Sequence, residues 1–153
     1  MLNNELDLTF NYEPIKYRDI KNGPGKPIDP KSQRLEVLKK AKPGDRSICD
    51  VYIRLGEKPR CFTDKIVWDD DILITLTGNC TIMRGKEQTY ISDEDIVSAG
   101  TFPTDYDFLG ERVGYIVGMS VPPIMMKRVI ERLIENNIFE QKENKNGRYY
   151  ENG

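Results

Sequence analysis

The sequence contains no histidine among its 153 residues. Histidine is the commonest general base and a frequent metal ligand, so its absence removes Ser-His and Cys-His catalytic pairs and most zinc sites. The three cysteines, Cys49, Cys61 and Cys80, match no CxxC metal pattern, and an odd number argues against a disulfide framework. We therefore expect reduced thiols, a cytoplasmic location and no metal site, and we do not expect a self-sufficient enzyme.

Long apolar runs are also missing. No run approaches the roughly 18 residues that a membrane-spanning helix needs, and the first ten residues lack the pattern of a secretion signal. We therefore expect no membrane partner. The length fits one domain, and a hydrophobic content of 38% is enough for a modest core.

Charge is unevenly distributed, although the formal net charge is only -2. Residues 12–46 include ten basic and five acidic residues, whereas residues 87–111 include seven acidic residues and no basic one. Such segregation favours different surfaces for different partners, and a basic segment is suited to nucleic acid. Ordinary solvated faces would produce the same pattern.

Capping signals predict three helices. The first covers residues 32–41, with Ser32 as its N-cap and a Pro-Gly pair after its end. The second follows an N-cap at Ser92 and runs to residue 99. The third begins at the proline pair 122–123, with Ser120 or Val121 near its cap.

The last of these helices has a broad apolar face. A few short strands and two short helices leave little surface to cover it, so either the β region packs there or a partner absent from this chain does. The face consists of Ile124, Met125, Met126, Val129, Ile130, Leu133, Ile134 and Ile138.

The middle of the chain, residues 48–82, has a β-like pattern. Val51, Ile53 and Leu55 alternate with polar or aromatic neighbours, which is typical of a half-buried strand. Two further β-rich runs follow at residues 66–68 and 72–76.

Two segments near the end of the chain resemble a known family. Residues 101–110 read TFPTDYDFLG, and residues 117–123 read VGMSVPP. Their order and spacing, after an acidic helix, resemble the C-terminal end of the DNA cytosine-5 methyltransferases. That family shows a Phe-Pro-x-x-Tyr-x-Phe segment, then a Gly-Asn-Ser/Ala-Val-Pro-Pro segment and an apolar helix. More loosely, residues upstream of 92 look like the target-recognition region of phage- and prophage-type members.

The resemblance implies that the chain reads double-stranded DNA beside a target cytosine. The Thr75-Leu76 pair resembles the threonine-aliphatic dipeptide of the family, which implies a backbone contact near the flipped nucleotide. Polar side chains between residues 46 and 84 are suited to phosphates or to base edges in the major groove. Our candidates for these contacts are Arg54, Arg60, Lys65, Asn79 and Arg84.

The resemblance also implies a cofactor contact for the second segment, which in the family lines the methionine end of S-adenosylmethionine. The candidates are Gly118, Ser120 and Val121. A helix N-terminus and a serine hydroxyl are suited to a carboxylate. Met119 stands where the family usually has Asn, so an amide's hydrogen bonds are lost at that position.

The family's catalytic segments are not found in this sequence. Its Pro-Cys nucleophile segment has only a poor counterpart in PRCF at residues 59–62, and its Glu-Asn-Val and Gly-rich cofactor segments are missing. We therefore expect a C-terminal fragment or small subunit, completed by a catalytic partner subunit or a missing N-terminal domain. S-adenosylmethionine would bind only together with that missing part.

The expected fold is α+β. Residues 1–100 would form a small, irregular, mostly antiparallel β target-recognition region with short helices. Residues 101–139 would rejoin a Rossmann-like catalytic domain, and residues 140–153 would form a polar tail. A stand-alone DNA-binding or regulatory module that uses basic residues 16–46 is the main alternative, and an interaction protein that docks through its last helix is a third.

Overall fold

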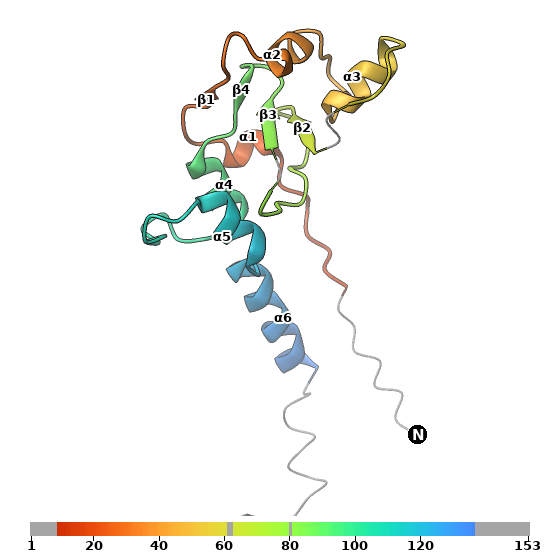
Figure 1. The fold of residues 1–153 in the computed structure, drawn as a ribbon. Helices are drawn as coiled ribbons and strands as arrows, with labels where there is room; N and C mark the ends of the chain where they lie inside the picture. Colours follow the sequence, from red (N-terminus) through yellow and green to blue (C-terminus); the bar gives the residue numbers. More distant parts are fainter. Residues whose placement is uncertain (1–8, 61–62, 80, 137–153) are drawn as a thin grey trace, which may run out of the picture. The chain divides into compact units, whose positions relative to one another are not determined.

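The computed structural model describes residues 9–60, 63–79 and 81–136 (Figure 1). Contacts between backbone positions divide the chain into two compact units. The larger unit is Glu13–Pro122, and the smaller one joins Met1–Tyr12 to Pro123–Gly153. The predicted tail 140–153 and Ile138 lie outside the described residues.

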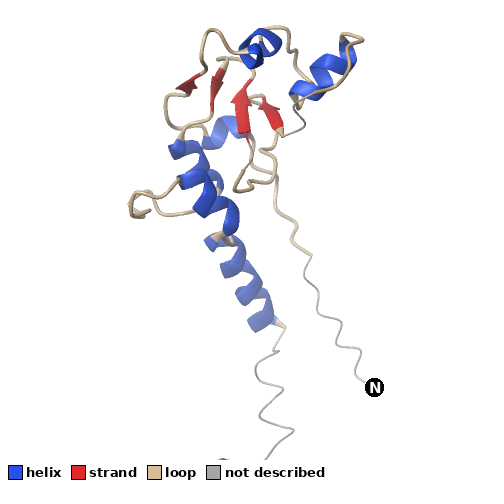
Figure 2. Ribbon diagram, viewed as in Figure 1, coloured by secondary structure: helices blue, strands red, loops and turns tan. Residues whose placement is uncertain are grey.

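A small mixed sheet lies in the larger unit (Figure 2). Its strand order is β1-β4-β3-β2, with β1 at Lys26–Pro27, β2 at Asp64–Val67, β3 at Thr81–Arg84 and β4 at Thr89–Tyr90. The α+β class is confirmed. β4 pairs antiparallel with β1 and β3, but the longest pairing, between β2 and β3, is parallel and sets Asp64 opposite Thr81.

Five short helices belong to the same unit: α1 at Tyr17–Ile20, α2 at Gln33–Leu38, α3 at Ile48–Arg54, α4 at Asp93–Ala99 and α5 at Val113–Met119. Two of them confirm the capping signals. Ser32 accepts a hydrogen bond at the start of α2, and Ser92 forms a reciprocal capping box with Asp95 at the start of α4.

The expected strand over residues 48–55 is wrong, because this segment is α3. Ser47 caps the helix by accepting a hydrogen bond from the Asp50 amide. Ile48, Val51 and Tyr52 are buried at helical spacing, whereas the other two members of the alternation, Ile53 and Leu55, are exposed. Residues 72–76 also do not form a strand of the sheet. Ile72 makes an isolated β-bridge with Lys16.

The core has two clusters. One gathers side chains from α2 and α3 with Ile66 and Met83, and the other gathers Tyr17 and Ile91 with Val67 and Ile82. Neighbouring strand residues such as Ile66 and Val67 enter different clusters because side chains alternate between the two faces of a sheet. Helices therefore cover both faces.

The predicted boundary at residue 100 does not coincide with the division of the backbone. α4 and α5 pack against each other, and residues 101–122 stay in the larger unit. The assignment of residues 101–139 to a catalytic domain stays a prediction.

In the smaller unit, α6 spans Pro123–Glu135, so the last helix begins at the predicted proline pair. The segment before the larger unit lies against α6. The Arg128 guanidinium lies 3.6 Å from the ring centroid of Tyr12, and Arg132 donates to the Thr9 carbonyl at 3.1 Å. No residue of α6 is buried, and most of its apolar face is exposed, although Val129 and Leu133 are half-buried.

None of the helices in the described part of the chain combines enough length with enough apolar character to cross a bilayer.

Candidate functional site

The loop 75–79 packs directly on α5. A Cβ atom at Gly118 would lie 2.5 Å from the carbonyl carbon of Thr77 and 2.6 Å from the amide nitrogen of Gly78. A side chain at position 118 would collide with backbone, so this approach requires glycine. Gly118 belongs to the segment that the resemblance relates to cofactor binding. Thr77 and Gly78 belong to the loop that it relates to DNA binding, so the contact holds the two segments together.

Some side chains of the loop 75–79 pack on the core, and others are exposed to solvent. Leu76 is half-buried and packs against the cluster around Val67 and Ile82. Thr75 and Asn79 are exposed. Thr77 is exposed as well, so the loop presents three polar side chains from a backbone that packs on α5, which suits contact with an external partner. The roles of Thr75 and Asn79 in DNA binding stay predictions.

Ser120 and Val121 follow α5. The Ser120 hydroxyl donates to the Val117 carbonyl at 2.8 Å, so it closes the end of α5 instead of capping the start of α6. Val121 is 51% exposed and Met119 is 70% exposed. The segment is therefore accessible to a ligand or a partner domain, but its serine hydroxyl already has an acceptor.

The Phe-Pro-x-x-Tyr-x-Phe segment folds on itself through its aromatic rings. The ring centroids of Phe102 and Tyr106 are 5.1 Å apart, and those of Tyr106 and Phe108 are 4.9 Å apart, both in edge-on geometry. Edge-to-face contacts of this kind add stability beyond simple burial. The spacing of the three aromatic residues thus has a local structural reason.

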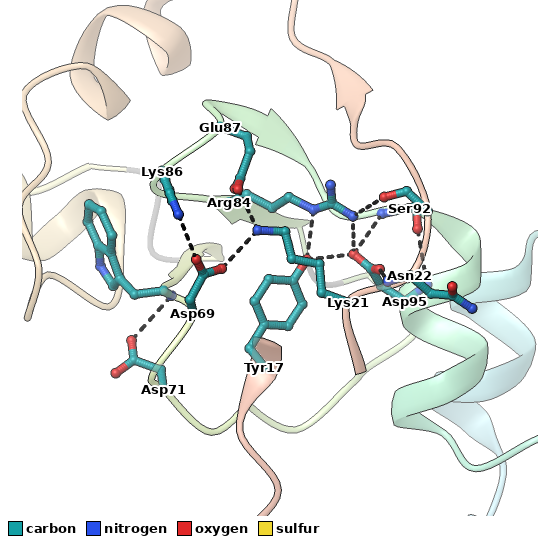
Figure 3. A network of polar contacts seen from close by, with 12 residues as sticks. Tyr17, Lys21, Asn22, Asp69, Asp71, Arg84, Lys86, Glu87, Ser92 and Asp95 are labelled. Carbon is teal, nitrogen blue, oxygen red and sulfur yellow. Dashed lines mark hydrogen bonds and ion pairs between the residues drawn. The ribbon is translucent and has the colours of Figure 1, made fainter. Parts of the chain in front are cut away.

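Arg84 is not a DNA-contacting residue in this fold, and that prediction is wrong. Its residue surface is only 3% exposed. The guanidinium donates to Asp95 at 2.5 Å, to the Tyr17 hydroxyl at 2.7 Å and to the Gly23 carbonyl at 2.7 Å (Figure 3). Arg84 therefore forms its ion pair and its hydrogen bonds with other residues of the protein.

Asp95 is the centre of this buried network. It is 0% exposed and accepts hydrogen bonds from Tyr17, Arg84 and the Asn22 amide. Burial favours a higher pKa for Asp95, but hydrogen bonds, chiefly from Tyr17 and Arg84, outweigh burial and lower the pKa below its ordinary value. Burial and the bond to Asp95 raise the pKa of Tyr17. The network ties the N-terminal part of the unit to β3 and α4.

Arg54 also has a partner inside the protein. It forms an ion pair with Asp45 at 2.8 Å and donates to the Lys40 carbonyl at 2.6 Å. The hydrogen bond from Arg54 is the main cause that lowers the pKa of Asp45. Arg54 is nevertheless exposed, so its contact with DNA stays a prediction, while in the fold it positions the loop before α3.

The other two candidates of the middle region differ in accessibility. Arg60 is exposed in the connection between α3 and β2, and Lys65 is half-buried on β2. Arg54, Arg60 and Asn79 are thus the exposed members of the predicted base-reading set, and of these Arg54 has an ion-pair partner within the fold. The loop 75–79 and Gly118 are in contact. Arg54 and Arg84, in contrast, form ion pairs with two different carboxylates, Asp45 and Asp95.

Sequence reasoning missed a group of exposed cations between α2 and α3. We call it the basic loop, residues 39–46, and its cations are Lys39, Lys40, Lys42 and Arg46. All four are exposed, and none forms an ion pair with another residue of the described ranges. The excess of basic residues in 12–46 was the available signal, but it did not distinguish these four from the others.

Within the described part of the chain, no three acidic, histidine or cysteine side chains are grouped so that they could hold a metal ion. Cys49 is a free, half-buried thiol, and Cys61 and Cys80 lie outside the described residues. No family model, curated protein or solved structure matches the chain.

Proposed function

We propose that this chain is the target-recognising, C-terminal part of a DNA (cytosine-5) methyltransferase, as a fragment or as a small subunit. The supporting observation is the contact of Gly118 with Thr77 and Gly78. In such an enzyme the flipped cytosine and the methyl donor must meet, so the DNA-reading and cofactor-lining segments need a fixed spatial relation. A backbone contact that only glycine permits supplies such a relation.

The proposed roles follow from accessibility. Thr75 and Leu76 would contact the backbone beside the flipped nucleotide, and Asn79, Arg60 and Lys65 would contact bases or phosphates around it. Arg54 and Arg84 would hold the scaffold. The chain would bind duplex DNA in the cytoplasm.

Gly118, Ser120 and Val121 would line the methionine end of S-adenosylmethionine in the completed enzyme. That cofactor would supply the methyl group for C5 of cytosine. The catalytic thiolate that attacks C6 would come from the partner subunit or from the missing N-terminal domain. The unburied face of α6 suits the apolar surface of such a catalytic part.

A selection from random duplex DNA tests the recognition role. We expect the recovered duplexes to share a short sequence that includes a cytosine. Asn79→Ala should weaken the preference by about tenfold, because a lost base contact is worth about that much. Thr75→Ala should weaken binding to all duplexes alike, because a backbone contact does not read sequence. Thr104→Ala is the matched control, since Thr104 is also exposed but lies between α4 and α5. Recovery of duplexes without a shared sequence would refute the recognition role.

A stand-alone DNA-binding or regulatory module is the second candidate, and the unpaired basic loop favours it. The double substitution Val121→Ala with Pro122→Ala separates the two candidates. A methyltransferase part would lose association with its catalytic partner and keep its DNA affinity. A stand-alone module would show no such partner, and both substitutions would leave its only activity unchanged.

A further inference from the structure

The basic residues of segment 12–46 fall into two groups once their partners are known. Along the first part of the segment, every cation except Lys31 is paired with a carboxylate from a distant part of the chain. Lys16 and Arg18 pair with Asp70, Lys21 pairs with Asp69 and Glu87, Lys26 pairs with Asp93, and Arg34 pairs with Asp64. The charge of this first group is therefore largely neutralised where it stands.

The cations of the basic loop have no such partners among the residues that the structure describes. The carboxylate within the loop, Asp45, is buried and already holds Arg54, and Lys42 adds only a weaker attraction to it. Asp50 accepts a hydrogen bond from the Arg46 amide and not from its side chain. Four positive charges within eight consecutive residues therefore face solvent.

The backbone of the basic loop is held in place. The Asp45 amide donates to the Lys42 carbonyl, and Gly44 adopts a φ of 103° in this turn, where glycine is strongly preferred. The Trp68 indole donates to the Asp45 carbonyl at 2.9 Å, and the Ile66 amide donates to the Arg46 carbonyl at 2.9 Å. The loop is thus fixed to β2, which lowers the entropy cost of binding a partner through it.

We propose that Lys39, Lys40, Lys42 and Arg46 bind the phosphate backbone of duplex DNA. The choice of DNA as the partner rests on the proposed function. Unpaired, exposed cations on a rigid loop bind phosphates with release of counterions, and such contacts hold a protein on DNA without reading sequence. Segments that bind membranes combine cations with large apolar side chains, and the basic loop has none between its cations.

Two matched triple variants test this inference. Lys39→Ala/Lys40→Ala/Lys42→Ala removes unpaired cations, and Lys16→Ala/Arg18→Ala/Lys26→Ala removes the same number of exposed but paired cations. Both variants lower the net charge equally. The affinity of the full chain for a duplex of random sequence is measured by fluorescence anisotropy between about 50 and 200 mM salt. Circular dichroism verifies that each variant is folded.

We expect the slope of log affinity against log salt to fall by about 2 to 3 in the first variant, because each lost phosphate contact removes about 0.9. The second variant should keep most of the slope. Equal slopes in the wild type and the first variant, or equal losses in both variants, would overturn the inference and leave the proposed function in place. Failure of the wild type to bind duplex DNA would overturn both.

A second experiment distinguishes DNA from an anionic membrane surface as the partner of the basic loop. The same proteins are mixed with vesicles of phosphatidylserine and phosphatidylcholine. Loss of vesicle binding in the first variant, with unchanged DNA binding, would assign the basic loop to a membrane surface and overturn the inference. Unchanged vesicle binding together with weaker DNA binding supports it.

Discussion

The network around Asp95 and the basic loop use the same residue types for opposite purposes. In the network, the cation of Arg84 is buried against Asp95 and shared with Tyr17. In the basic loop, the buried Asp45 forms an ion pair with Arg54 of α3. The four cations of the loop itself remain exposed. The comparison shows that charge counted along a sequence is not charge available at a surface. Ion-pair partners distant in sequence decide which cations can meet a polyanion.

The largest effect is expected from Arg84→Met. Removal of one partner leaves Asp95 as an uncompensated buried charge, which costs about 3–5 kcal/mol. The free energy of unfolding in urea measures this loss. Lys86→Ala is the control, because the Lys86–Asp69 pair at 3.2 Å is exposed on the lysine side and should contribute less than about 1 kcal/mol. Similar losses in the two variants would contradict the structural role of the network.

A smaller effect is expected from Gly118→Ala. The added methyl group would lie 2.5 Å from the Thr77 backbone, and relief of such overpacking costs about 1–3 kcal/mol. Gly114→Ala in the same helix is the matched control. Its Cβ would meet the Ile96 side chain at 3.6 Å, an ordinary contact, so better helix propensity should leave stability unchanged or raise it by up to about 1 kcal/mol. Equal destabilisation would argue against the loop contact.

The dependence of stability on pH tests the contribution of Asp95 to the buried network. A carboxyl with a lowered folded pKa stabilises the fold above its unfolded value of 3.8, and this contribution is lost as the pH falls through the folded value. Urea unfolding at neutral pH and below pH 3.8 should therefore show weaker stability in acid. Asp95→Asn should flatten this part of the profile, whereas an unchanged profile would show that Asp95 does not contribute to it.

The smallest effect is expected from Lys39→Ala/Lys40→Ala/Lys42→Ala. Exposed side chains without partners contribute within about 0.5 kcal/mol each to stability. The unfolding free energy should therefore stay close to that of the wild type, while the salt dependence of DNA binding changes. A large loss of stability would mean that these lysines support the fold.

Local signals predicted part of the fold. α2, α4 and α6 begin where Ser32, Ser92 and Pro123 indicated, because caps and prolines act over a few residues. α3 was mistaken for a strand because its apolar residues fit both a period of two and the helical period. α5 has glycines at positions 114 and 118, which lower helix propensity, and the second is required by contact with a distant loop.

The candidate site was predictable to a similar extent. Thr75 and Asn79 are exposed in the loop that packs against Gly118, and their functional roles stay predictions. Arg84 could not be excluded from the sequence, because its burial and its partner Asp95 are identified only by the fold. The same long-range pairing concealed which cations of segment 12–46 have no ion-pair partner among the described residues.

Transfer of labelled methyl groups to duplex DNA tests the proposed function most directly. The chain is assayed with S-adenosylmethionine alone, and then together with a catalytic polypeptide of a DNA cytosine-5 methyltransferase that contains the Pro-Cys and Gly-rich segments but lacks its recognition region. We predict no transfer by the chain alone and transfer to cytosine when both polypeptides are present. Methylation by the chain alone, or an equal rate with and without it, would contradict the proposal.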